Sequence, residues 1–299
     1  MAKNTLQEFS DALADAAERA GKSTVLVDAR KRLPASGIAF AGDMILTADH
    51  VVERDDDLKV TLADGTTLAA RLAGRDPGTD LAVLKLDSAS AASAEVTQTP
   101  ARVGQLVLSL GRPSTSGIEA SLGTVSAING PVRTGRGGML EKYIRTDTIS
   151  FPGFSGGPLV AADGSVLGIN TSGLAHGTGL TIPADVAWKV ADTLAKHGHI
   201  KRGYLGIRSQ TVEIPAAAQG ALKREQATGL LVMGVEKDSP ATKGGLMVGD
   251  ILVGIAGAAT QHHDELFTRL SGDVVGKSTP IEVIRGGELK TVNVVVGER

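Results

Sequence analysis

Ser155 lies in the segment FPGFSGGPLV, residues 151–160, which places three glycines and two prolines around one serine. Gly and Pro are common wherever a chain simply turns, so the segment is compatible with an ordinary surface loop. The same residue types also suit a nucleophilic hydroxyl held beside backbone N–H groups that can bind an oxyanion. The second interpretation requires a base and an orienting acid elsewhere in the chain.

His50 is the best candidate base among the six histidines, because it follows the apolar run MILTAD and would be delivered to a sheet end. Asp80 stands directly before LAVLKL, a predicted strand. The order His50, Asp80, Ser155 is that of the chymotrypsin triad, although each residue alone is more often a surface or capping group. The remaining histidines are assigned no catalytic role, and the HHD run is not expected to bind metal; they are His176, His197, His199, His262 and His263.

The composition is that of a soluble globular protein of about two domains: 299 residues, 42% hydrophobic, 21% charged and a net charge of −2. This charge argues against a nucleic-acid partner. The absence of cysteine excludes disulfides, thiolate metal sites and a cysteine nucleophile. We expect no cofactor, no metal and no membrane span. Because the N-terminus has no signal-peptide pattern, the chain as written reads as cytoplasmic, or as extracytoplasmic if a leader has been removed.

The elements that must position these residues are mostly short strands. Residues 5–20 have apolar positions at helical spacing and predict an amphipathic helix. From residue 23 to about 183, short β runs alternate with Gly, Asp and Pro, as in an all-β barrel or sandwich, and a helix follows. A separate α+β unit starts near residue 203. The predicted domains are an N-terminal helix at 1–22, a protease-like domain at 23–198, a linker at 199–203 and a final domain at 204–299.

The chain resembles the HtrA/Deg family of trypsin-like serine proteases with a C-terminal PDZ domain. The resemblance covers about residues 23–299 and is carried by ILTADHVV, DPGTDLAVLKL, SGGPLV, DGSVLGINT, RGYLGI and SPATKGGLMVGDIL. It implies a chymotrypsin-like double β-barrel followed by an α+β PDZ domain. It further implies that His50 is the general base, Asp80 its orienting acid and Ser155 the nucleophile. The oxyanion would bind the N–H groups of Gly153 and Ser155.

The resemblance also implies a substrate pocket formed by Ile149 and Ser150 together with Thr171, Ser172 and Gly173. With no acid at its base, this pocket favours cleavage after small or medium apolar residues. In the PDZ domain the resemblance assigns carboxylate binding, and hence C-terminal peptides as partners, to Tyr204, Leu205, Gly206 and Ile207.

Two positions depart from the family pattern, since Phe151 and Phe154 stand where the family usually has Asn. Either the rings pack against the barrel wall, or they alter an activation loop that can hold inactive conformations. The expected function is an ATP-independent serine endopeptidase acting on unfolded or misfolded proteins in quality control. The alternative is a latent or silent peptide-binding, chaperone-like scaffold; an esterase is disfavoured by the triad order. Relatives assemble as trimers, so a homotrimer is expected.

Overall fold

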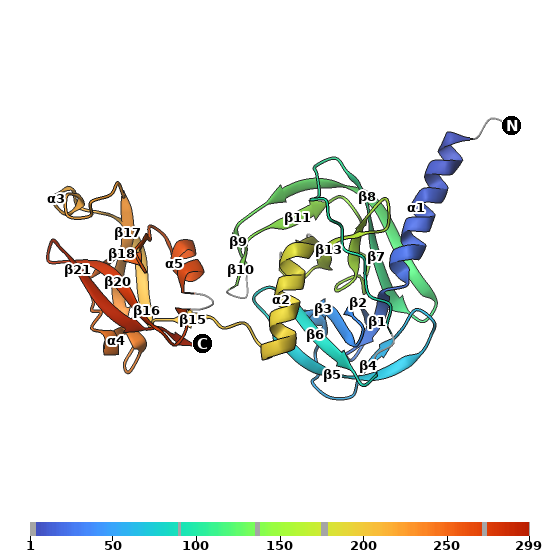
Figure 1. Ribbon diagram of the computed structural model, residues 1–299, viewed down its shortest axis with the longest axis horizontal. Helices are drawn as coiled ribbons and strands as arrows, with labels where there is room; N and C mark the ends of the chain where they lie inside the picture. Colours follow the sequence, from blue (N-terminus) through green and yellow to red (C-terminus); the bar gives the residue numbers. More distant parts are fainter. Residues whose placement is uncertain (1–3, 89–90, 135–137, 175–178, 271–273, 299) are drawn as a thin grey trace. The chain divides into compact units, whose positions relative to one another are not determined.

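The structure is a computed structural model that describes residues 4–88, 91–134, 138–174, 179–270 and 274–298. The chain divides into two compact units, Met1–Ile200 and Lys201–Arg299 (Figure 1). Each unit has its own hydrophobic core, and each is described separately below.

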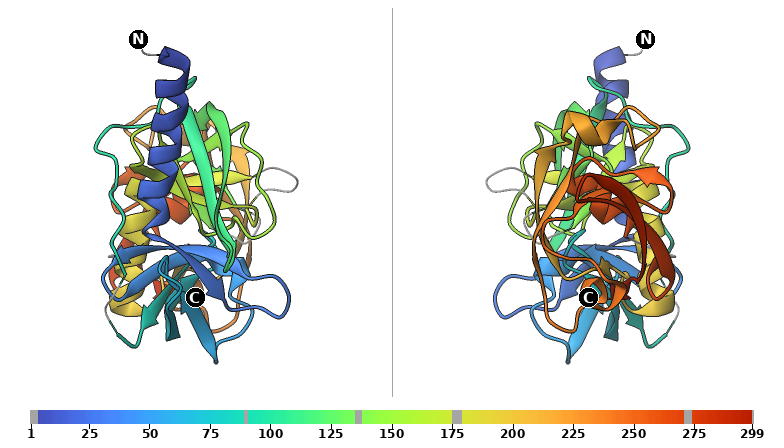
Figure 2. Two further views of the ribbon diagram at one scale, coloured as in Figure 1. Left: turned by 90° about the vertical axis from the view of Figure 1, so that its right-hand side faces the viewer. Right: turned by 90° about the vertical axis from the view of Figure 1, so that its left-hand side faces the viewer.

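Helix α1, Thr5–Gly21, begins at Asn4, whose side chain accepts a hydrogen bond from the backbone N–H of Leu6. Only the second half of the helix is buried, through Ala16 and Ala20. The first half extends beyond the strands, as Figure 2 shows, and leaves Leu6 74% exposed. The amphipathic helix predicted for residues 5–20 is therefore present, with part of its apolar face uncovered.

The first barrel closes six antiparallel strands in the order β1-β2-β3-β6-β5-β4, and β1 pairs with β4 to complete it. The residues are mostly Val, Ile, Leu and Ala, whose side chains fill the interior because aromatic residues are scarce. The strands are β1 Thr24–Asp28, β2 Ala35–Ala41, β3 Met44–Ala48, β4 Leu58–Thr61, β5 Thr67–Asp76 and β6 Leu81–Leu86.

The second barrel has the order β11-β14-β13-β12-β7-β8. Its strands are β7 Leu106–Ser114, β8 Gly117–Asn129, β11 Tyr143–Thr146, β12 Pro158–Ala161, β13 Val166–Thr171 and β14 Leu180–Pro183. The run MLEKYIRTD forms two short strands, β10 Met139–Leu140 and β11. The two parts pair differently: β10 only with β9, Val132–Arg133, and β11 with the barrel strands β8 and β14. Helix α2, Ala184–His197, follows and ends at Gly198 in the left-handed conformation.

One apolar core joins the two barrels and α2. Leu46 and Leu81 of the first barrel, Leu110 and Ile169 of the second, and Ala187 of α2 belong to the same fully buried cluster. Removing such side chains from water is the main source of stability in a fold of this kind. The shared core fixes the first barrel against the second, so residues from the two barrels can form one site.

The second unit is an α+β domain whose main sheet has the order β16-β17-β18-β20-β21, with β19 beside β18. Strand β16 therefore lies at an edge of the sheet. The strands are β15 Gly203–Tyr204, β16 Ile207–Glu213, β17 Thr228–Val235, β18 Ile251–Ile255, β19 Ala258–Ala259, β20 Ser278–Arg285, β21 Glu288–Val295 and β22 Gly297–Glu298. The helices are α3 Ala216–Gln219, α4 Pro240–Gly244 and α5 His263–Arg269. Two closed barrels followed by an α+β domain confirm the predicted fold class.

Candidate active site

The three residues of the predicted triad come from both barrels. His50 lies in the 3-10 turn η1, Asp49–Val51, directly after β3, and Asp80 directly precedes β6. Asp80 has φ +56°, a left-handed conformation that is uncommon for a residue other than glycine. Ser155 lies in the loop between β11 and β12 of the second barrel. The structure brings these three residues to one place, at the junction of the barrels.

Asp80 is fully buried and holds His50 by two hydrogen bonds. Its Oδ1 accepts the backbone N–H of His50 at 2.9 Å, and its Oδ2 lies 2.8 Å from His50 Nδ1. The hydroxyl of Thr171 donates to the same Oδ2. In the tautomer in which His50 Nδ1 donates to the Asp80 carboxylate, the lone pair of a base is on Nε2.

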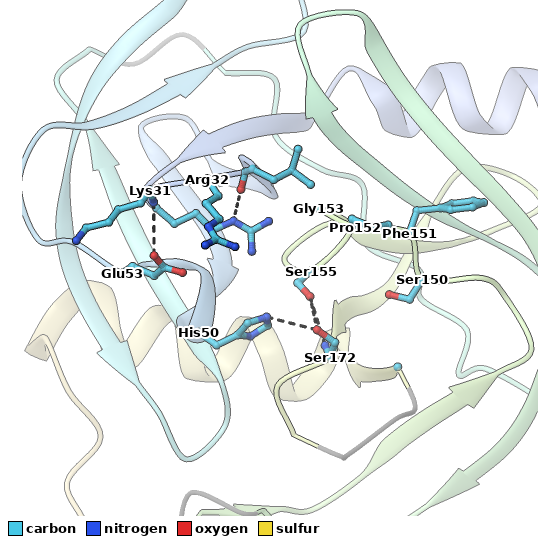
Figure 3. Close-up of a pocket in the computed structure, with 13 residues that line it drawn as sticks. Lys31, Arg32, His50, Glu53, Ser150, Phe151, Pro152, Gly153, Ser155 and Ser172 are labelled. Atoms are coloured by element: carbon cyan, nitrogen blue, oxygen red, sulfur yellow. Dashed lines mark hydrogen bonds between the residues drawn. The ribbon is translucent and has the colours of Figure 1, made fainter.

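The hydroxyl of Ser172 lies close to both the hydroxyl of Ser155 and the imidazole of His50. The Ser172 Oγ is 3.1 Å from the Ser155 Oγ and 3.5 Å from His50 Nε2, as Figure 3 shows. The backbone N–H of Ser172 also donates to the Ser155 Oγ, at 3.4 Å. In this arrangement the Ser155 hydroxyl is paired with a second hydroxyl that lies next to the imidazole of His50.

The turn that presents Ser155 requires glycine at two positions. Gly153 has φ +92° and Gly156 has φ +87°, conformations that L-residues with side chains rarely adopt. A Cβ at Gly156 would lie 2.1 Å from the carbonyl oxygen of Ser36, and a Cβ at Gly153 would lie 2.6 Å from the Cβ of Pro113. The chain can therefore make this turn only with these two glycines.

Ser36, at the start of β2, fixes the same turn from the first barrel. Its Oγ donates to the Gly153 carbonyl at 2.6 Å and accepts the backbone N–H of Arg112 at 2.8 Å. Its own N–H donates to the Ser155 carbonyl at 3.2 Å. The N–H of Phe154 donates to the carbonyl of Phe151, so the peptide between the two proposed oxyanion donors is held at both ends. Among the described residues, no protein acceptor takes the N–H of Gly153 or of Ser155.

Arg112 anchors this region to the end of α1. Its Nε donates to the Thr24 carbonyl at 2.8 Å and its Nη2 to the Gly21 carbonyl at 3.0 Å. Burial lowers the pKa of the Arg112 guanidinium from its ordinary value, because desolvation disfavours the charged form. The helix end, the barrel strand and the Ser155 turn are thus connected through neighbouring buried polar groups.

Phe154 and Phe151, the two departures from the family pattern, pack against each other. The ring of Phe154 is fully buried and lies edge-on to Phe151, with centroids 5.3 Å apart. A Cβ at Gly111 would lie 2.5 Å from the Phe154 ring, so β7 has room for that ring only because it has glycine there. Phe154 thus packs against the barrel wall, as in the first of the two interpretations, whereas Phe151 is 40% exposed and lines the pocket.

An open pocket of about 810 Å³ has Ser155 and His50 among its lining residues. Of the predicted pocket residues, Ser150 and Ser172 line it. Ile149 is 61% exposed, and Thr171 is buried with its hydroxyl on Asp80, so neither side chain forms the wall. Gly173 lies behind the pair of His50 and Asp80, since a Cβ there would lie 2.5 Å from Asp80 Oδ2.

The pocket also has residues that sequence reasoning did not assign to it. They are Arg30, Lys31, Arg32, Leu33, Glu53, Phe151, Pro152 and Gly179. The signal that could have drawn attention to the basic residues is their occurrence as three consecutive cations in a chain of net charge −2.

In the second unit, the segment predicted to bind a carboxylate leads into the edge strand β16. Leu205 is buried, and its carbonyl accepts the N–H of Ala241 in α4. The Gly206 carbonyl accepts the N–H of Glu236, and the Tyr204 hydroxyl donates to the carboxylate of that residue. The segment is therefore held by hydrogen bonds on the side of α4, next to strand β16, which among the described strands pairs with β17 alone.

Helix α5 stands beside this edge strand. The Nε2 of His263 lies 3.1 Å from both the Oγ and the carbonyl oxygen of Ser209 in β16. His262 lies 3.7 Å from Glu265. Among the described residues no group of three or more His, Cys, Asp or Glu side chains is arranged to hold a metal ion. His176 lies outside the described residues.

Within the part of the chain that the structure describes, no helix combines the length and apolar character needed to cross a membrane.

Comparison with known proteins assigns both units to families. The trypsin-like peptidase domain matches residues 35–169, and the PDZ domain matches residues 203–296. A probable periplasmic serine endoprotease, DegP-like, of Halomonas elongata is 37% identical over 276 residues, covering 90% of this chain and 57% of the relative. The corresponding protein of Brucella suis biovar 1 is 33% identical, covering 87% and 52%. The chain thus spans about half the length of these curated relatives.

Solved structures match nearly the whole chain. The structure described as HtrA-type protease AlgW with tripeptide has a TM-score of 0.79 and 32% identity, covering 96% of this chain and 97% of that one. The serine endoprotease from Yersinia pestis has a TM-score of 0.79 and 29% identity, covering 96% and 98%. These matches extend over both units and confirm the predicted resemblance. The chain belongs to the HtrA family of trypsin-like serine proteases that carry a PDZ domain.

Proposed function

We propose that this protein is a serine endopeptidase in which His50, Asp80 and Ser155 form the catalytic triad. The observation that carries the proposal is the fully buried Asp80 bound to both the backbone N–H and the Nδ1 of His50, with Ser155 in the same pocket. A neutral imidazole with a free Nε2 beside a serine hydroxyl is the arrangement that activates a nucleophile.

Catalysis begins when a bound peptide displaces the Ser172 hydroxyl and Ser155 turns toward His50. Nε2 takes the proton of the Ser155 hydroxyl as its Oγ attacks the peptide carbonyl carbon. The N–H groups of Gly153 and Ser155 bind the negative oxygen that results. The imidazolium, stabilised by Asp80, then gives its proton to the leaving amine, and an acyl-enzyme remains. In the second half of the reaction His50 takes a proton from a water molecule, whose oxygen attacks the acyl carbonyl carbon. The imidazolium then returns the proton to the Ser155 Oγ, which releases the carboxylic acid product and restores Ser155.

The substrates are extended, unfolded segments of protein, cleaved without ATP after small or medium apolar residues. Support for the apolar preference comes from the wall near Ser150, which is formed with Phe151, Pro152 and Gly179 and has no acid. A basic side chain before the cleaved bond would find no counter-charge there. Mass spectrometry of casein fragments tests this: cuts after Val, Ala or Leu are expected, and cuts mainly after Lys or Arg would refute it.

We further assign peptide C-termini as ligands of the PDZ domain, bound at Tyr204–Ile207 and along β16. An edge strand offers unpaired backbone groups to which a peptide can add as a further strand. Titration of a labelled apolar peptide with a free or an amidated C-terminus tests the assignment. Binding that requires the free carboxylate is expected, and equal affinity for the two forms would refute it.

A homotrimer assembled through the N-terminal segment is the proposed assembly. Its support in this chain is the exposed apolar face of α1, where Leu6 is 74% and Phe9 44% exposed. Light scattering should give the mass of three chains, falling to one in Leu6→Ser/Phe9→Ser. A monomeric parent protein would refute this part of the proposal.

Labelling with a serine-directed phosphonate tests the catalytic assignment and separates it from a silent scaffold. The parent protein should gain the mass of one phosphonyl group, and Ser155→Ala should gain none. Modification at another serine, or equal labelling of both proteins, would refute the assignment of Ser155.

A further inference from the structure

The loop between β1 and β2, residues 29–34, places three consecutive cations beside the nucleophile. Arg30, Lys31 and Arg32 all line the pocket that contains His50 and Ser155. Among the described residues that line it, Glu53 is the only acidic one. The pocket is thus locally basic in a chain whose net charge is −2.

The loop is held in place by hydrogen bonds that do not involve the side chains of Lys31 and Arg32. Arg30 donates from Nε to the Leu33 carbonyl and from Nη2 to the Pro34 carbonyl, the latter at 3.1 Å. Arg54 donates to the Arg30 carbonyl at 3.0 Å. Arg30 and Arg54 therefore fix the shape of the loop, and this fixed backbone presents Lys31 and Arg32.

Lys31 and Arg32 are exposed and form no ion pair with an acid in the part of the chain described. The contact of Lys31 with Glu53 is through its backbone N–H, at 3.5 Å. The ammonium group of Lys31 and the guanidinium group of Arg32 can consequently bind a negatively charged group at the edge of the pocket.

The position of the loop indicates which part of a substrate would meet these cations. Figure 3 shows Ser155 between Lys31 and Arg32 on one side and Ser150 and Phe151 on the other. When the side chain before the cleaved bond lies toward Ser150, the chain after that bond runs toward the loop. At about 3.3 Å per extended residue, the first three residues after the bond cover this region.

We propose that the loop Arg30–Arg32 determines specificity by selecting substrates with acidic side chains in the first three positions after the cleaved bond. The inference rests on the proposed endopeptidase function and adds a substrate class to it. The contacts are exposed to solvent, so each is expected to change the specificity constant about two- to fivefold. The preference should weaken as added salt screens the charges.

The test uses the full-length protein and a set of quenched fluorescent peptides with one apolar cleavage site. The peptides differ only in having Asp, Asn or Lys at each of the three positions after the cut, and their C-termini are amidated so that the PDZ domain offers them no carboxylate site. The parent should prefer Asp over Asn and Asn over Lys, with Asp about fivefold over Lys. In Lys31→Glu/Arg32→Glu the order should reverse.

A matched control carries the same charge change elsewhere on the first barrel. Lys59→Glu/Arg71→Glu alters two exposed cations of β4 and β5 that do not line the pocket. This variant should keep the parental order of the three peptides. Equal cleavage of Asp and Lys peptides by the parent, an acidic preference confined to positions before the cut, or loss of the preference in the control would overturn the inference.

Binding to Ser155→Ala separates this inference from the proposed function. Fluorescence anisotropy of the same peptides should show the order Asp, Asn, Lys without any cleavage. A charge order in binding together with an inert parent protein would refute the endopeptidase and keep the basic loop as a peptide-binding element. Cleavage by the parent with no charge order, in rates or in binding, would refute the loop and keep the endopeptidase.

Discussion

Replacing Ser36 with Ala should disrupt the active-site turn although Ser36 is not itself a pocket residue. The hydroxyl of Ser36 is the donor to the Gly153 carbonyl and the acceptor for the Arg112 N–H, at 2.6 and 2.8 Å. Ser36 is fully buried, so water cannot readily replace the hydroxyl in the variant. The substitution leaves one buried carbonyl and one buried N–H without their partner.

Each buried polar group left without a partner lowers the free energy of unfolding by about 1–3 kcal/mol. Because relaxation of the turn recovers part of this loss, we expect the two groups together to lower it by about 2–4 kcal/mol. Relaxation also rotates the peptide group between Gly153 and Phe154. Because this group lies between the N–H groups of Gly153 and Ser155, its orientation determines where those two proposed oxyanion donors point. Complete loss of one donor costs about 10²–10³ in rate, so partial misalignment should lower kcat about tenfold. KM should change little, because Ser36 does not line the pocket.

Urea unfolding and casein-peptide kinetics at a temperature where the variant is folded measure the two effects. Ser36→Cys, which replaces the hydroxyl with a somewhat larger thiol that still donates weakly, should keep more of the parental kcat than Ser36→Ala. Ser116→Ala, an exposed serine in the β7–β8 turn, is the control and should match the parent in both assays. A Ser36→Ala protein that loses stability but keeps the parental kcat would refute the claim that this hydroxyl aims the oxyanion donors.

Three further substitutions test other contacts of the first unit. Ser172→Ala removes the hydroxyl that is paired with the Ser155 hydroxyl, a bond worth about 1 kcal/mol, so phosphonylation of Ser155 should become up to about fivefold faster; a tenfold slower reaction would mean that Ser172 relays the proton. Phe154→Ala should cost about 3–5 kcal/mol in urea unfolding, because the ring is fully buried, and a loss below about 1 kcal/mol would contradict its tight packing. A hydrogen bond from the backbone N–H of Thr124 in β8 lowers the pKa of the exposed Asp147 carboxyl. The ionised carboxylate therefore stabilises the fold at pH values above the pKa that Asp has in the unfolded chain, about 4. This stabilisation is lost as the pH falls through the lowered pKa of the folded state. The melting temperatures of the parent and Asp147→Asn should therefore converge on acidification, and a gap that widens in acid would contradict the contact.

Short-range patterns were enough to predict an all-β barrel or sandwich and to select His50, Asp80 and Ser155 as a candidate triad, whereas the two-barrel arrangement was implied by the family resemblance. Each strand and its turn are encoded within a few consecutive residues, and the order His50, Asp80, Ser155 along the chain indicated the triad. The structure places the three residues together because a shared core joins the barrels, which is a property of the packed fold.

The contacts that no local pattern contains are those between distant residues. Ser36 meets Gly153 across 117 positions, and nothing in the segment PASG distinguishes its serine from one in a surface turn. The contact of the Ser172 hydroxyl with both Ser155 and His50 depends on how β13 ends beside the turn. The three cations of the β1–β2 loop were visible as a charge run, but only the fold shows that they line the pocket.

The most direct test of the central claim is cleavage of unfolded casein by the parent protein and by Ser155→Ala, followed over time without ATP. We expect fragments to accumulate with the parent and none with the variant, at equal folded concentrations confirmed by circular dichroism. Cleavage by both proteins at the same rate would contradict the assignment of Ser155 as the nucleophile. An inert parent that remains inert with apolar C-terminal peptides, and that no phosphonate labels, would contradict the endopeptidase itself.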